Sequence, residues 1–225
     1  MNRTCRHNGF SIIEMVIVAF VMIVLIGLTI PAAFRVQTQA VQMKDLNNGK
    51  QIYLGLKLFA TDNDGRFPWA NYDAAFGGPA TTGSISNANA AYQNICPQYV
   101  QLRAIFYVAN SVWTPRVPDE NATTAPLTQP GENAYAYVPG LTTNSNPNFP
   151  LLADAFSSTI GVYSRTLGEK GSLWKGKSAL VVRVDGATRF EPCNPKTLRI
   201  PGEADRPDIF APGRGWIPQA PVNPL

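Results

Sequence analysis

The sequence predicts an α+β protein in which a long N-terminal stalk helix packs, by its C-terminal half, on a small antiparallel sheet with long loops. Three observations lead to this fold class. A long apolar run over residues 10–34 contains a single charged residue, Glu14. Apolar residues then recur at three- and four-residue spacing as far as Ala60, which is typical of a helix. Further on, Asp185 and Gly186 separate two strand-like runs, which is a strong hairpin signal.

The apolar run sets the topology of the chain. As a helix with a rise of about 1.5 Å per residue, residues 10–34 are long enough for a hydrocarbon core of about 30 Å. Arg3 and Arg6 precede the run, and positive residues beside a first apolar segment stay in the cytoplasm. We therefore expect a single-pass inner-membrane protein with a periplasmic C-terminus. Placing Glu14 in lipid costs about 2.5–3.5 kcal/mol on insertion scales, which indicates a function for it.

Other interpretations of this segment stay open. A secretory signal has an apolar stretch of about 7–15 residues and then a small-residue cleavage site. The run here is longer, and residues 31–35 offer only a poor Ala-x-Ala-like site. A plain signal anchor gives Glu14 no purpose. Alternatively, Glu14 snorkels to the cytoplasmic headgroups, because it lies near the helix end.

The helical pattern continues beyond the apolar run. The apolar residues that carry it are Val36, Ala40, Met43, Leu46, Tyr53, Leu56 and Phe59. It stops at the turn formers of residues 61–65. Pro31 lacks an amide hydrogen, so we expect a kink or a loosened turn around Gly27 and Pro31. One half of such a long helix needs lipid or neighbouring subunits around it, and the other half needs a sheet.

Composition and pattern together predict four parts: a leader over 1–9, a transmembrane and polymerisation helix over 10–34, the periplasmic half of the stalk helix over 35–61, and a loop-rich globular β domain over 62–225. The sequence holds 19 prolines and 18 glycines, and only 15% of its residues are charged. These values fit a loop-rich domain. The net charge is +4 and falls to about +2 without the two leader arginines, so no nucleic-acid binding is predicted.

Within the globular part the pattern is coarser. The strand candidates are 133–138, 150–156, 159–163 and the hairpin runs 179–184 and 187–190. Residues 70–94 are expected to form a long loop, and residues 103–113 a short helix or a strand. The proline-rich residues 192–225 have almost no periodicity, so we expect them to wrap the surface or trail off.

The run from Gly9 to Glu14, GFSIIE behind a basic leader, resembles the type IV prepilin signal. The resemblance implies that a prepilin peptidase cleaves between Gly9 and Phe10 and methylates the new amine of Phe10. The carboxylate of Glu14 then reaches the neighbourhood of that amine, or of the amine of an adjacent subunit. In a low dielectric such a pair fixes the register of apolar helices. Family likeness implies further partners: copies of itself, other pilins, an assembly ATPase and an inner-membrane platform.

A second resemblance lies at the end of the stalk. Residues 55–68, with the run DNDGRFP, resemble the stalk end of G-type major pseudopilins of type II secretion systems. Together with the hairpin 179–190 they resemble still more the prepilin-type proteins of planctomycetes and verrucomicrobia, although the histidines those relatives often carry near the hairpin are absent. The resemblance covers residues 1–68 and 179–190.

These resemblances imply the pilin fold and a structural subunit of a type II secretion pseudopilus or a type IV pilus. They leave open which of the two filaments it builds and whether the subunit is major or minor. The alternative is a minor or tip pilin whose globular domain binds a surface, a glycan or DNA. A third possibility is an uncleaved, membrane-anchored periplasmic binding domain.

Two further candidate sites concern the mature chain. Cys5 leaves with the leader, so Cys96 and Cys193 form an even pair in an exported domain, and a disulfide is expected, with two free thiols as the alternative. Asp62 and Asp64 are calcium candidates, but the fragment lacks the other loop ligands. Termination of the helix explains these two residues more simply.

The sequence argues against an enzyme. The only histidine, His7, lies in the leader, which excludes histidine-based triads and most zinc sites from the mature chain. No phosphate-binding loop, Gly-x-Ser-x-Gly or Cys-x-x-Cys occurs. A carboxylate pair for glycoside hydrolysis stays open. Apart from calcium, no cofactor is expected.

Overall fold

The structure is a computed structural model that describes residues 11–73, 78–79, 84–117, 130–202, 206–213 and 215–225, with the side chains of residues 28–35 and of the strand residues between 72 and 79 outside the description. Residues up to Met43 form one compact unit and residues from Lys44 form a second. Three helices and a four-stranded antiparallel sheet lie in the described parts of the chain. The predicted α+β class is therefore confirmed.

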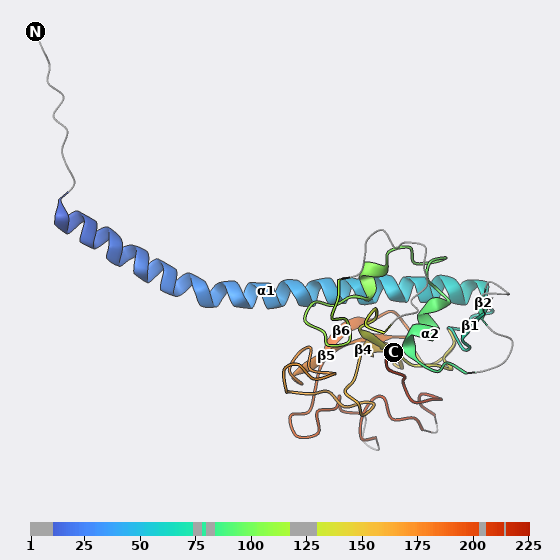
Figure 1. Cartoon of the computed structure of the whole chain (residues 1–225). Helices are drawn as coiled ribbons and strands as arrows, with labels where there is room; N and C mark the ends of the chain where they lie inside the picture. The colour runs from blue at the N-terminus through green and yellow to red at the C-terminus, as the bar shows by residue number, and fades with distance from the viewer. Residues whose placement is uncertain (1–10, 74–77, 80–83, 118–129, 203–205, 214) are drawn as a thin grey trace, which may run out of the picture. The chain divides into compact units, whose positions relative to one another are not determined.

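Helix α1 spans Ile12–Asp62, 51 residues (Figure 1). Its end is built as the turn formers predict. The backbone amides of Asn63 and Gly65 both donate to the carbonyl of Ala60, at 3.2 and 2.8 Å. Asp64 and Gly65 have φ angles of +52° and +75°, in the left-handed region that closes many helices. The predicted first residue of the helix, Phe10, lies outside the described residues.

The main sheet has the strand order β3-β4-β5-β6, with every neighbouring pair antiparallel. Its strands are β3 Tyr135–Tyr137, β4 Pro150–Asp154, β5 Ser178–Arg183 and β6 Thr188–Pro192. Each strand pairs with the next one along the chain, so the sheet is a simple meander. The strands predicted over 133–138 and 150–156 and the predicted hairpin are all confirmed.

The hairpin between β5 and β6 turns at the predicted dipeptide. Gly186 has a φ of +88°, which an L side chain rarely adopts. The carboxylate of Asp185 accepts a hydrogen bond from the amide of Ala187 at 2.8 Å. A Cβ at Gly186 would lie 2.6 Å from a ring carbon of Tyr53 in α1, so this turn needs glycine for two separate reasons.

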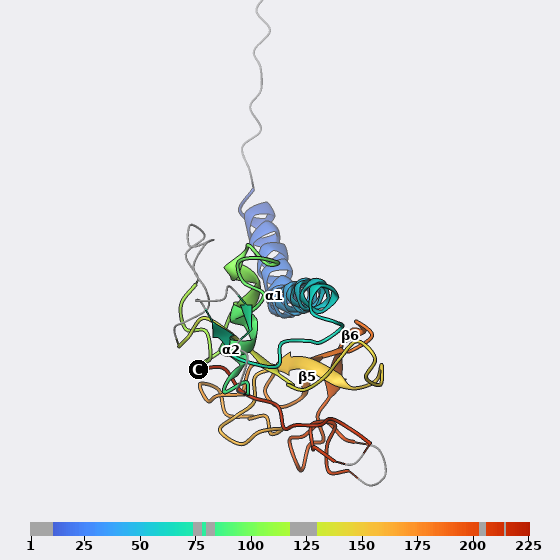
Figure 2. The same ribbon diagram turned by 90° about the vertical axis from the view of Figure 1, so that its right-hand side faces the viewer.

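The C-terminal half of α1, which belongs to the second unit, packs on this sheet, as the end-on view in Figure 2 shows. Ile52, Leu56 and Phe59 are buried on its inner side. A Cβ at Gly49 would lie 2.9 Å from Leu180 Cδ2 in β5. Glycine at this position therefore lets the helix approach the sheet closely.

The region before the sheet is more ordered than predicted. Residues 70–94 were expected to form one long loop, but they contain β1 Tyr72–Asp73, β2 Gly78–Pro79 and helix α2 Ala88–Gln93. The loop prediction is therefore wrong. The side chain of Asn87 caps α2 by accepting from the amide of Ala90 at 2.9 Å, and the small alanines of α2 are buried. Between residues 103 and 113, Arg103–Phe106 form the short 3₁₀ helix η1.

Two other predictions also need correction. Residues 159–163 form a turn instead of a strand, because the amide of Val162 donates back to the carbonyl of Thr159 and Gly161 has a φ of +78°. The C-terminal region is irregular, as predicted, but it does not trail off. Val222 forms an isolated bridge with Tyr137 of β3. The C-terminal side chains buried in the core are Ile200, Ile209, Phe210 and Ile217.

Candidate assembly site

The N-terminal part of α1 exposes apolar side chains all round its axis. Every described side chain from Ser11 to Gly27 is exposed. The large apolar side chains among them are 44–85% exposed: Ile12, Ile13, Met15, Val16, Ile17, Val18, Phe20, Val21, Met22, Ile23, Val24, Leu25 and Ile26. Covering each such side chain is worth about 1.5–3 kcal/mol. A helix that is apolar on every side is stable only where its surroundings are apolar on every side.

Glu14 is the one charged residue between Ser11 and Gly27. It lies in the first turn of α1 and is exposed. The carbonyl of Ser11 accepts from the amides of Glu14 and Met15, at 3.0 and 3.2 Å, which starts the helix. A carboxylate in a first turn suits the partial positive charge of the helix N-terminus. Gly9 and Phe10, the predicted cleavage and methylation site, lie outside the described residues.

Two predictions concern the middle of this segment. Helix α1 continues without a break through Gly27 and Pro31, so a kink there stays a prediction. A Cβ at Gly27 would contact no atom within 4 Å.

In the part of the chain that the structure covers, no helix combines the length and apolar character needed to cross a membrane. The predicted transmembrane segment 10–34 includes Phe10 and side chains outside that part.

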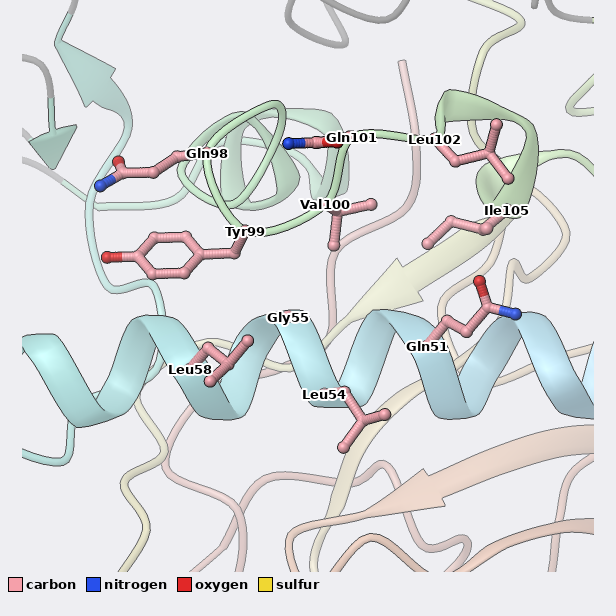
Figure 3. A pocket seen from close by; sticks show the side chains of 10 residues that line it. All are labelled: Gln51, Leu54, Gly55, Leu58, Gln98, Tyr99, Val100, Gln101, Leu102 and Ile105. Atoms are coloured by element: carbon pink, nitrogen blue, oxygen red, sulfur yellow. The ribbon is translucent and has the colours of Figure 1, made fainter.

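A groove lies along α1 in the second unit, with a volume of about 380 Å³. Figure 3 shows α1 residues on one side and the segment 98–105 on the other. Leu54 and Leu58 are exposed on α1, and Leu102 is exposed on the opposite wall. A Cβ at Gly55 would lie 2.4 Å from Val100. The absence of a side chain at Gly55 therefore lets the two walls of the groove approach each other closely.

The two calcium candidates, Asp62 and Asp64, lie where α1 ends. The hydroxyl of Tyr99 donates to the carboxylate of Asp62 at 2.8 Å, and Asp64 occupies the left-handed turn after α1. Among the described residues, no group of three or more acidic, histidine or cysteine side chains is placed to hold a metal ion. The positions of both aspartates fit termination of the helix, and calcium binding stays a prediction.

The predicted disulfide is absent. Cys96 and Cys193 are both buried and free. Each lies in its own packed environment: Cys96 lies within the turn that follows α2, and Cys193 directly follows β6. An even number of cysteines indicates only that pairing is possible, because the distance between two thiols is decided by the tertiary fold.

Sequence reasoning missed a pair of buried acids. Asp45 on α1 and Asp154 at the end of β4 are only 1% and 2% exposed. Each carboxyl perturbs the pKa of the other, which places the two groups side by side. The available signal was an aspartate inside the otherwise apolar stretch 150–156. Asp45 looked like an ordinary polar residue on a helix, so nothing linked the two.

The tryptophans would be natural contact residues for a binding domain, but they pack against other residues of the second unit. Trp113 is buried, and its indole donates to the carbonyl of Phe156 at 2.9 Å. The others are half-buried, with Trp69 beside Phe59 and the remaining two beside aromatic rings of the second unit. Their placement does not single out a ligand surface.

Comparison with known proteins gave no match: neither a family description, nor a curated protein, nor a solved structure is significantly similar to this chain.

Proposed function

We propose that this chain is a structural subunit of a helical filament, either a type II secretion pseudopilus or a type IV pilus, with the pilin fold. It is processed after Gly9 and polymerises through its N-terminal helix. The observation that carries the proposal is the N-terminal part of α1, which is apolar and exposed on every side. Copies of the same helix, bundled side by side, supply the apolar surroundings that this surface requires.

The charges of the N-terminus support the same proposal. Cleavage leaves a positive amine on Phe10, and Glu14 is the one carboxylate of the apolar segment. At 4 Å and an effective dielectric constant of about 20, a pair of opposite charges attracts by about 4 kcal/mol. Apolar helices slide past each other easily, so one such pair between neighbouring subunits fixes their axial register.

The membrane has a role before assembly. Arg3 and Arg6 keep the leader in the cytoplasm, so residues 10–34 cross the inner membrane and the part from residue 35 onward enters the periplasm. Transfer from lipid into the filament exchanges one apolar environment for another, which provides little driving force. An assembly ATPase and a membrane platform are therefore required partners, together with the prepilin peptidase.

The proposal is tested with Glu14→Ala and with the charge-retaining control Glu14→Asp, each expressed beside the wild-type chain. We expect intact-mass analysis to show all three chains starting at methylated Phe10. We expect the Glu14→Ala chain to be depleted at least about tenfold from sheared filaments, since about 1.4 kcal/mol corresponds to tenfold. Immunogold labelling of the filaments then separates a major subunit, which labels the length, from a tip subunit.

Either of two results would contradict the proposal. One is native protein that keeps its first nine residues. The other is incorporation of Glu14→Ala at the wild-type level.

A further inference from the structure

The buried acids Asp45 and Asp154, the carboxyl pair, connect α1 to the sheet. One oxygen of Asp45 accepts from the hydroxyl of Tyr135 at 2.6 Å. One oxygen of Asp154 accepts from the indole of Trp174 and from the amide of Leu180, both at 2.8 Å. The second oxygen of each carboxyl, Oδ2 of Asp45 and Oδ1 of Asp154, is buried and has no other hydrogen-bond partner.

Two ionised carboxylates at this buried place would repel each other, so the pair needs a proton to remove one of the two charges. The donors to the two carboxyls among the described residues are neutral groups: the hydroxyl of Tyr135, the indole of Trp174 and the amide of Leu180. Among the described residues, the arginines that form ion pairs do so with other carboxylates: Glu132, Glu191 and Asp208. Two buried, adjacent negative charges without a cation are strongly unfavourable. A proton shared by the two carboxyls removes one of the two charges and turns one acceptor into a donor for the other carboxyl.

The groups that face the pair do not compete for this proton. Burial, followed by the charge of Asp45, raises the pKa of Tyr135 well above its usual value. Burial and then Asp154 do the same for Tyr163, and they raise the pKa of Cys193 to about 12. The indole of Trp174 does not titrate. All these neighbours therefore stay neutral through the range in which the pair titrates.

We propose that Asp45 and Asp154 share a proton that fastens the C-terminal half of α1 to the sheet, and that loss of this proton in alkaline solution loosens their packing. The inference concerns the globular unit alone and does not depend on filament assembly. It makes the packing of the C-terminal half of α1 on the sheet, within the second unit, sensitive to pH.

The direction of the effect follows from the pair itself. Burial raises the pKa of Asp154 to about 7, and burial and the neighbouring Asp154 raise the pKa of Asp45 well above its usual value. A carboxyl whose folded-state pKa lies above its unfolded value stabilises the fold fully below about pH 4. For Asp154 that contribution is lost as the pH rises through about 7, and for Asp45, whose pKa the charge of Asp154 raises, it is lost at higher pH.

The test is thermal unfolding of the full chain in detergent between pH 5 and 9, followed by tryptophan fluorescence. We expect the melting temperature of the wild type to fall by about 5–10 °C over this range. In Asp45→Asn the amide donates permanently to Asp154, and its carbonyl still accepts from Tyr135, so the fall should become clearly smaller than in the wild type. The matched control Asp64→Asn changes an exposed aspartate in a left-handed turn that asparagine tolerates, and it should melt like the wild type.

Several outcomes overturn the proposal. One is a wild-type melting temperature that does not fall with pH, and another is an Asp45→Asn variant that falls as steeply as the wild type. A melting temperature that drops with EDTA and recovers with calcium would show a bridging cation instead of a proton. If Asp45→Asn does not fold, Asp154→Asn takes its place. Infrared spectra of the wild type at pH 6 must also show a protonated carboxylic acid whose band weakens as the pH rises to 9.

Discussion

The carboxylate of Glu191 serves two arginines that differ mainly in burial, which allows a sharp prediction. Arg183 donates to one oxygen of Glu191 through Nε at 3.1 Å and Nη2 at 2.6 Å. Arg189 donates to the same oxygen through Nε at 3.1 Å. The side chains of Arg183 and Glu191 are 10% and 11% exposed, whereas that of Arg189 is 62% exposed.

Removing the shared charge should therefore destabilise the domain through the buried arginine. Glu191→Gln preserves the side-chain volume but leaves Arg183 buried without an opposite charge, and breaking such a pair costs about 3–5 kcal/mol. The carbonyl of Asn148 still accepts a hydrogen bond from Arg183, which places the expected loss near the lower end, about 3 kcal/mol. The matched control Arg189→Gln removes only an exposed partner and should cost no more than about 1 kcal/mol.

The assay is urea unfolding of the full chain in detergent, followed by tryptophan fluorescence, at low and at high salt. High salt should shrink the small effect of Arg189→Gln and leave most of the effect of Glu191→Gln, because buried charges are screened less. Equal losses for the two variants, or a loss below about 1 kcal/mol for Glu191→Gln, would refute the reasoning from burial.

Two other predictions follow from packing. Gly49→Val should destabilise the second unit by about 1–3 kcal/mol, because its side chain meets Leu180 at the close approach of α1 to the sheet; urea unfolding that matched the wild type would contradict this close packing. Burial raises the pKa of Cys96 to about 11 and, ahead of the charge of Asp154, that of Cys193 to about 12, so both thiols should resist alkylation at pH 8 in the native protein and react after denaturation. Rapid native alkylation, or a mass showing two hydrogens lost to a disulfide, would disprove that account of the cysteines.

Local rules in the sequence determined a large part of this protein. The end of α1 was predictable because a run of aspartate, asparagine and glycine favours the left-handed turn that closes a helix. The β5–β6 hairpin was predictable because Asp185 and Gly186 fit a tight turn between two strand-like runs. The apolar N-terminal segment and its single acid, Glu14, can likewise be read directly from the order of residues.

Only the tertiary structure decided which distant residues meet. Residues 70–94 have a loop-like composition, yet α2 forms there because burial of its alanines and one asparagine cap stabilise a helix too short to form alone. Cys96 and Cys193 were both available for pairing, but the fold buries them as free thiols. Asp45 and Asp154 are more than a hundred positions apart, and only the docking of α1 on the sheet brings their carboxyls together and removes water from them. Turn and helix signals act over a few residues, whereas desolvation and pairing depend on the whole packed domain.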